Sequence, residues 1–162
     1  MIETRKATDA DWNQIWLIVH EAFARGDTYA YPPDTDKEQG YAIWMESPGA
    51  TYVAVEDEEI LGTYYIKPNQ PGLGSHVCNA GYMVSAKARG KGIGPSMCAH
   101  SLKEAVKLGF KAMQYNLVVA TNVSAIQLWK DMGFEIIGTL PKAFDHKTKG
   151  LVDACVMYQF LT

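Results

Sequence analysis

The sequence lacks several features that would assign it to a specialised class of protein. Its three cysteines are widely spaced and include no Cys-x-x-Cys pair, so neither a disulfide framework nor a zinc site is expected. No apolar stretch approaches the roughly 20 residues that a membrane span needs. Met1 to Lys6 carry charges where a signal peptide needs an apolar run. We therefore expect a cytoplasmic protein with no membrane partner and no bound metal.

Clustered positive charge is also lacking. The 15 Lys and Arg residues stand against 18 Asp and Glu residues, which gives a net charge of −3. Because a nucleic-acid-binding surface needs Lys and Arg gathered together, no nucleic acid partner is expected. The remaining composition, 48% hydrophobic and 20% charged over 162 residues, is typical of a globular protein and predicts one domain over residues 1–162.

Apolar spacing, glycines and prolines predict a mixed α/β (α+β) domain. Trp12, Ile15, Val19 and Phe23 recur at helical spacing, and Thr8 before them is of a type that caps helices. The predicted order is an extended start at 4–6, a helix after Thr8, a helix at 36–45, strands at 51–55, 60–66 and 76–84, a helix ending at Leu108, a strand at 111–119, a helix after Asn122, and strands at 134–140 and 151–161.

The segment Arg89-Gly90-Lys91-Gly92-Ile93-Gly94 joins a predicted strand to a predicted helix. Glycine lets the backbone approach a ligand closely, and the first N–H groups of a helix are unpaired and favour an anion. The P-loop pattern is absent, and the dinucleotide fingerprint fails because Met97 stands where its last glycine is required. The turn is therefore predicted to bind phosphate. The alternative is a strand-to-helix turn with two solvated basic residues.

Arg89 to Gly94 resembles the Arg/Gln-x-x-Gly-x-Gly pyrophosphate loop of the GNAT acyltransferase superfamily. Downstream, Asn122 to Phe134 resembles that superfamily's Asn-x-x-Ala-x-x-Leu-Tyr-x-x-x-Gly-Phe helix and begins 28 residues after Gly94. The predicted order of elements also matches the family over nearly the whole chain. The resemblance implies the GNAT fold, a mixed, mostly antiparallel twisted sheet of about six or seven strands, splayed at a β-bulge, with about four helices packed on it.

The resemblance also implies which residues bind acetyl-CoA. Backbone groups of the strand before the loop would pair with pantetheine, and the loop amides would hold the pyrophosphate. Asn122 would contact pantetheine near the acetyl end, or would cap its helix, for which Asn is well suited. The implied set is Met83, Val84, Arg89, Gly90, Lys91, Gly92, Ile93, Gly94, Ser96 and Asn122.

One departure from the family pattern affects the chemistry. Trp129 stands where many members carry a tyrosine that protonates the leaving thiolate, and an indole N–H is a poor acid. Tyr82, Tyr115, Tyr158 or water could supply that proton. The thiolate could also leave unaided, since a thiol pKa of roughly 8.5 makes it a fair leaving group. Trp129 itself is expected to pack in the core or to wall the acyl pocket.

The attacking amine must lose a proton, and a carboxylate or histidine, often working through water, usually takes it. Glu21, His20, His76 and Asp153 are the candidates, and His76 opens the strand that leads to the loop. Each of them is more often a surface or structural residue than a catalytic one.

Three short segments give a narrower resemblance, to the GNAT branch that acetylates proline analogues such as azetidine-2-carboxylate. They are Cys78 to Val84, Gln114 to Asn122 and Leu140 to Phe144. In that branch, asparagines at the positions of Asn79 and Asn116 are thought to engage the substrate. The alternative is that both amides bridge neighbouring strands, because a buried amide without a partner costs about 1–3 kcal/mol.

Tyr29 and Tyr31 lie in the 25–41 segment, which borders the acceptor site in this fold. They would wall that site, or pack a rigid loop. The predicted function is direct transfer of an acetyl group from acetyl-CoA to an amine of a small molecule, with Asn79, Asn116 and Tyr82 as catalytic candidates. The alternatives are acetylation of a protein or peptide amine, and a non-catalytic acyl-CoA-binding module. GNAT domains often pair, so a homodimer is a candidate assembly.

Overall fold

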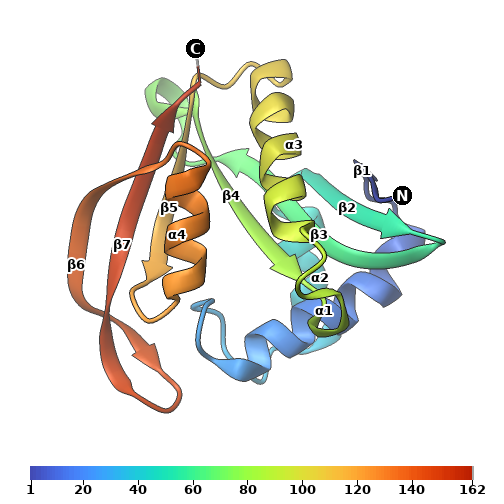
Figure 1. The fold of residues 1–162 in the computed structure, drawn as a ribbon, viewed down its shortest axis with the longest axis horizontal. Helices are drawn as coiled ribbons and strands as arrows, with labels where there is room; N and C mark the ends of the chain where they lie inside the picture. Colours follow the sequence, from blue (N-terminus) through green and yellow to red (C-terminus); the bar gives the residue numbers. More distant parts are fainter. Residues whose placement is uncertain (162) are drawn as a thin grey trace.

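The computed structural model describes residues 1–161 and contains one seven-stranded sheet with helices packed on it (Figure 1). The mixed class and the number of strands agree with the prediction. No helix in this range is long and apolar enough to cross a lipid bilayer. The elements are β1 (Glu3–Lys6), α1 (Trp12–Arg25), α2 (Lys37–Tyr41), β2 (Ala50–Glu56), β3 (Glu59–Pro68), β4 (Val77–Val84), α3 (Ile93–Lys107), β5 (Ala112–Val119), α4 (Val123–Asp131), β6 (Glu135–His146) and β7 (Gly150–Phe160).

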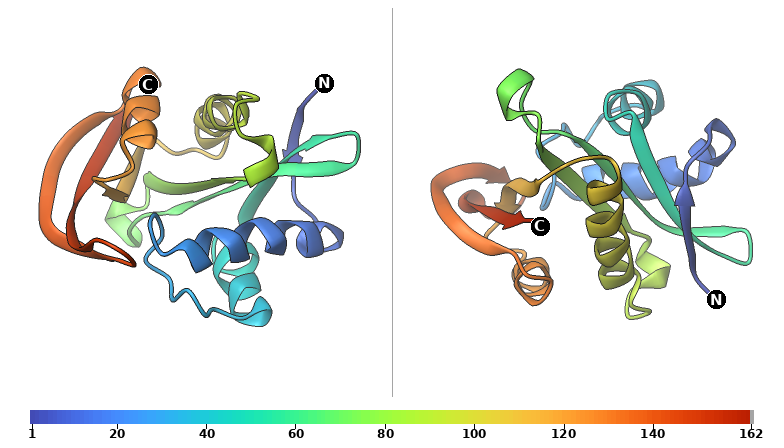
Figure 2. Two further views of the ribbon diagram at one scale, coloured as in Figure 1. Left: turned by 60° about the horizontal axis from the view of Figure 1, so that its bottom comes forward. Right: turned by 90° about the horizontal axis from the view of Figure 1, so that it is seen from above.

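The sheet separates two hydrophobic cores. Figure 2 shows α1 and α2 on one face of the sheet and α3 and α4 on the other. The predicted apolar stripe of α1 is buried in the first core, and the aromatic and methionine side chains of the later strands fill the second. The largest members are Ile15, Val19, Phe23 and Trp44 in the first core, and Tyr64, Met97, Met113 and Met157 in the second.

The strand order is β1-β2-β3-β4-β5-β7-β6, and β4 and β5 are parallel neighbours. They pair only from Val77 with Ala112 to Asn79 with Gln114, and beyond that point they diverge into a V (Figure 1). The predicted splay is therefore present, but the bulge is elsewhere. The β3–β4 register runs unbroken through Val84, and the irregularity lies in β5, between Tyr115 and Val118 where it pairs with β7.

Strand β6 is longer than the predicted 134–140. Pro141 follows the predicted end of the strand, but β6 lies at the edge of the sheet, where a proline without an N–H is tolerated. The chain bulges between Leu140 and Phe144 and continues as strand to His146. The extension brings the hairpin tip to the loop between α1 and α2, where Lys147 N–H donates to the carbonyl of Gly26 at 3.0 Å.

Asp11 ties β1 to the start of the first helical segment. Its carboxylate accepts two N–H bonds from the Arg5 guanidinium, at 2.8 and 2.9 Å, and one from the backbone N–H of Thr8 at 2.8 Å. Thr8 therefore stands at the N-terminal cap of a helical segment, as its residue type indicated. The bond to Arg5 is the largest cause that lowers the pKa of the Asp11 carboxyl, and burial opposes it.

We expect Asp11→Asn to lower the free energy of unfolding by about 1 kcal/mol at pH 7, the usual scale for a lost capping interaction. The folded-state pKa of Asp11 is depressed, so its contribution is complete above the unfolded pKa of about 4 and is lost as pH falls through the folded value. Urea unfolding at pH 7, 5 and 3 should show the two proteins converging below about pH 4. The exposed Asp34→Asn is the control, and a difference that persists undiminished at pH 3 would contradict the assignment.

Candidate active site

A cleft of about 940 Å³ opens between β4 and β5 where the two strands diverge. The turn after β4, the loop between α1 and α2, and the N-terminal end of α4 complete its walls. The predicted site residues that line it are Tyr29, Tyr31, Asn79, Tyr82, Met83, Val84, Arg89, Gly90, Gly92, Ile93, Gly94, Asn116 and Asn122. Residues from five segments of the sequence therefore meet at one place, as predicted.

The turn after β4 presents backbone N–H groups to the end of this cleft. Gly90 and Gly92 have φ of 81° and 76°, a left-handed conformation that other residues adopt only with strain. The first bond of α3 runs from Ser96 N–H to the Gly92 carbonyl at 3.1 Å, so the N–H groups of Ile93 and Gly94 precede the bonded ladder. These amides and the positive end of the helix dipole favour an anion.

Lys91 and Ser96 lie outside the residues that line the cleft. The Ser96 N–H already bonds Gly92, and the Lys91 ammonium lies 3.9 Å from the carboxylate of Glu56. Both were predicted to bind the pyrophosphate, and the structure gives each another partner. Of the predicted loop residues with a polar side chain, only Arg89 lines the cleft.

Backbone alternation decides which residues of β4 can pair with a ligand strand. Ser85 N–H donates to the Leu61 carbonyl at 2.8 Å, so in the unbroken antiparallel register Met83, two residues earlier, also turns its backbone groups to β3. The backbone groups of Tyr82 and Val84 then face the cleft. Met83, for which pairing with pantetheine was predicted, turns its backbone groups to β3, and its side chain packs in the core on the α1 side.

Tyr29 reaches across the cleft wall to β4. Its hydroxyl donates to the carbonyl of Tyr82 at 2.6 Å, which shows that this carbonyl is turned away from β3. Burial raises the pKa of Tyr29 above its usual value, so it remains a neutral donor. The rings of Tyr29 and Tyr31 also pack against Phe23, with centroids 6.1 and 5.1 Å away. Loop packing and a cleft wall are thus both present.

The hydroxyls of Tyr82 and Tyr115 belong to a buried chain of hydrogen bonds. Tyr115 donates to Tyr82 at 3.0 Å, Tyr82 lies 2.6 Å from the Ser101 hydroxyl, and Ser101 donates to the carbonyl of Cys98 at 2.7 Å. The Ser101 hydroxyl donates its only proton to that carbonyl, so Tyr82 is the donor in the bond between Tyr82 and Ser101. Each of the three protons is therefore directed into the core, and burial raises the pKa of both tyrosines.

This arrangement corrects the prediction that Tyr82 serves as an acid, because its proton points to α3 and away from the cleft. Trp129 packs on both tyrosine rings, with centroids 4.9 and 4.8 Å away, and it also lines the cleft. Tyr158, in β7, lies outside the cleft lining.

The two asparagines differ in their surroundings. Asn79 is buried at the vertex of the V, where its oxygen accepts from the Tyr65 hydroxyl at 3.1 Å and its amide donates to the Gln114 carbonyl at 3.0 Å. Asn116 is exposed and bonds Asn69 at 2.7 Å. The strand-bridging interpretation therefore fits Asn79, and Asn116 presents a more accessible amide to the cleft.

Asn122 caps α4, as one of its two interpretations predicted. Its side-chain oxygen accepts from the N–H of Ala125 at 3.4 Å, and the residue also lines the cleft. The capping bond uses the side-chain oxygen and not the side-chain NH₂ group.

The structure does not bring the predicted bases to the cleft. His20, Glu21, His76 and Asp153 are exposed, and they line neither this cleft nor the smaller cavity beside it. The acid and the histidine that line the two cavities are instead Asp27 and His146. The sequence carried a weak signal for His146, which follows Phe144 at strand spacing, but the strand had been ended at Leu140.

Comparison with known proteins places the chain among acyltransferases. The profile of the acetyltransferase (GNAT) family matches residues 12–134. The solved structure of a GCN5-related N-acetyltransferase from Kribbella flavida is 43% identical, superimposes with a TM-score of 0.93, and is matched over 99% of this chain and 98% of that one.

Two further relatives add detail. N-acetyltransferase aca1 of Schizosaccharomyces pombe is 44% identical over 102 residues, which span 62% of this chain and 48% of that protein, so this chain matches about half of its length. A phosphinothricin acetyltransferase from Sinorhizobium meliloti, solved in complex with AcCoA, shares the fold at 21% identity with a TM-score of 0.87, over 99% of this chain and 88% of that one.

Proposed function

The chain belongs to the acetyltransferase (GNAT) family, and on that premise we propose that it is an N-acetyltransferase that moves an acetyl group from acetyl-CoA directly to an amine of a small molecule. The observation that carries the proposal is the V between β4 and β5, with its amide-lined turn at the open end. A pyrophosphate fits that turn, and an extended amide-containing arm fits the unpaired edge of β4.

The residues for the donor follow from this geometry. Arg89 and the amides of Gly90, Gly92, Ile93 and Gly94 would hold the pyrophosphate. The cleft-facing backbone groups of Tyr82 and Val84 would pair with pantetheine, with the amide of Asn122 nearby. Acetyl-CoA supplies a thioester carbonyl that an amine can attack. In that transfer the new N–C bond replaces the C–S bond, and the amine loses one proton.

The proton balance does not require a tyrosine acid in the cleft. The hydroxyl protons of Tyr82 and Tyr115 are directed into the core, and Trp129 offers an indole. We propose that the thiolate leaves without a side-chain acid and takes its proton from water, which the moderate basicity of a thiolate allows.

On the acceptor side we propose that Asn116 orients the amine, and that Tyr29 and Tyr31 wall the site. The support is that all three line the cleft and that Asn116 is exposed there. The narrower proposal, a proline analogue such as azetidine-2-carboxylate as acceptor, is supported by Asn79 and Asn116 lying on the two strands that bound the cleft.

The test is release of CoA thiol from acetyl-CoA in the presence of amine panels. We expect acetyl transfer to small amines, confirmed by mass of the product. Transfer to peptide N-termini or lysines alone would replace the small-molecule acceptor by a protein amine. If acetyl-CoA binds and no amine accelerates thioester cleavage, the chain is a binding module.

We also propose a homodimer and a reducing, cytoplasmic location. The edge formed by β6 and β7 exposes apolar side chains, with Ile137 57% and Leu151 61% exposed. Such an edge can be covered by a second copy, and light scattering that gives the monomer mass would remove this proposal. The three cysteines are buried free thiols, which suits a reducing compartment.

A further inference from the structure

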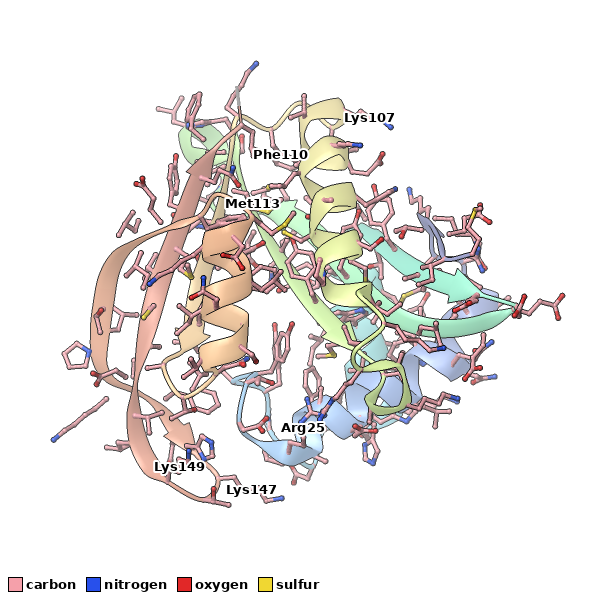
Figure 3. All side chains as sticks on the ribbon, viewed as in Figure 1. Arg25, Lys107, Phe110, Met113, Lys147 and Lys149 are labelled. Carbon is pink, nitrogen blue, oxygen red and sulfur yellow. The ribbon has the colours of Figure 1, made fainter. Side chains whose placement is uncertain are left out.

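A second cavity, of about 290 Å³, lies where the tip of the β6–β7 hairpin meets the loop between α1 and α2. Every residue that lines it is polar or charged: Asp27, Thr28, Thr121, Asn122, His146 and Lys149. Asp27, Thr28 and Asn122 also line the main cleft, so the two spaces share a wall. Figure 3 shows Lys147 and Lys149 on the hairpin tip and Arg25 near the end of α1.

His146 offers this cavity a hydrogen-bond donor. The residue is buried, and its Nδ1 accepts the backbone N–H groups of Thr148 at 3.2 Å and Lys149 at 3.3 Å. A ring nitrogen that accepts two N–H bonds carries no proton, so the neutral ring is protonated on Nε2. The ring is therefore fixed as an Nε2–H donor.

Asp27 offers the opposite charge. Its Oδ1 is buried and finds no hydrogen-bond partner among residues 1–161. The Arg25 Nε lies 3.5 Å from it, at ion-pair distance, but the same guanidinium also bonds Glu21 at 3.2 Å. A buried carboxylate oxygen without a donor is unfavourable, and the amino group of a ligand would supply one.

We propose that this cavity extends the acceptor site lined by Asn116 and that it selects a zwitterionic α-amino acid. Asp27 accepts a hydrogen bond from the amino group, and the Nε2–H of His146 with the Lys149 ammonium binds the carboxylate. A carboxylate and a cationic side chain on opposite loops complement the two charges of such a ligand. The inference rests on the proposed function and adds the residues that would bind the amino and carboxylate groups of an amino-acid acceptor.

The first test uses acceptors that differ only in the carboxylate: azetidine-2-carboxylate, its carboxamide and azetidine, and in parallel L-alanine, L-alaninamide and ethylamine. With acetyl-CoA saturating, we expect kcat/KM for the acid to exceed that for its carboxamide by at least about tenfold, which is the effect expected from one charged contact. Lys149→Gln should reduce that preference. Lys142→Gln, an exposed hairpin lysine outside both cavities, is the matched control and should leave it unchanged.

The second test separates recognition from hairpin structure. His146→Asn places an oxygen where Nδ1 accepts the turn amides but removes the Nε2–H donor. We expect a near-native Tm with a loss of about tenfold or more in kcat/KM for the acid and little change for the amide. Asp27→Asn should raise the amine KM for all acceptors and leave CoA affinity unchanged. If Asp27 and His146 only stabilise the fold, both variants should lower Tm without changing the acceptor preference.

The outcomes distinguish the two levels of the proposal. Absence of transfer to every amine, with acetyl-CoA bound, overturns the proposed function. Efficient transfer with equal use of acid and amide, and silent Asp27→Asn and His146→Asn variants, overturns the amino-acid subsite alone and leaves the acetyltransferase proposal standing.

Discussion

Gly92→Glu is expected to abolish acetyl-CoA binding, with a loss of at least about a hundredfold in affinity. Gly92 has φ of 76° and immediately precedes α3, at the point where the loop amides face the cleft. A side chain there would enter the space a pyrophosphate requires, and its carboxylate would repel that anion. The N-terminal end of α3 attracts an anion, and the introduced carboxylate would offset that attraction. Calorimetry with CoA and with acetyl-CoA measures the effect.

Gly72→Glu is the matched control for this variant. Gly72 also has a positive φ, 56°, and a Cβ added at either glycine meets no atom within 4 Å. Both substitutions therefore impose the same kind of backbone strain and the same charge, but Gly72 is exposed and outside the cleft. We expect similar changes in Tm and unchanged CoA affinity for Gly72→Glu. If Gly92→Glu still binds CoA normally, the anion cradle is placed wrongly.

The turn and the helix ends that we propose hold the donor could be predicted from the sequence because their determinants are local. The positive φ of Gly92, the helix beginning at Ile93 and the cap at Asn122 each depend on a few consecutive residues. Short-range signals of this kind specify a turn and a helix end almost independently of the rest of the chain. The divergence of β4 from β5 was predicted from the family resemblance and not from residue spacing.

The acceptor half could not be predicted in the same way, because it depends on long-range pairing. Asp27 and His146 are far apart in sequence and meet only because β6 continues past Pro141 at an exposed edge. The assignment of Met83 failed for a different reason. Side-chain patterns do not reveal which backbone groups of a central strand face which neighbour, and that parity is set by the β3–β4 register.

The chain of hydrogen bonds between hydroxyl groups also could not be predicted from the sequence. Tyr82 and Tyr115 were candidate acids because tyrosine has an ionisable proton, but the direction of that proton depends on Ser101 and on the Cys98 carbonyl in α3. Three donors in series that end on a backbone carbonyl leave none for the cleft. Chemistry inferred from residue type alone therefore overstated what these two side chains can do.

Asn79→Ala is expected to be the most destabilising change at the site. It leaves the Tyr65 hydroxyl and the Gln114 carbonyl without their buried partner at the last paired position of β4 and β5. Two such losses cost about 2–4 kcal/mol, which corresponds to a fall in Tm of roughly 5–10 °C for a domain of this size. Because Asn79 sits where the strands begin to part, we also expect lower kcat. Thermal unfolding and steady-state kinetics measure both.

Asn116→Ala is the contrasting variant. Asn116 is exposed and bonds Asn69 and Gln114 side chains, so its loss should change Tm by no more than about 2 °C. We expect a rise of about tenfold in the amine KM with CoA affinity unchanged, because the side chain faces the acceptor side of the cleft. Together, Asn79→Ala and Asn116→Ala separate strand bridging from substrate binding, two roles that the sequence left open for both asparagines. If Asn79→Ala unfolds at the wild-type temperature but loses turnover, Asn79 engages the substrate and does not serve as the bridge that fixes the vertex of the V.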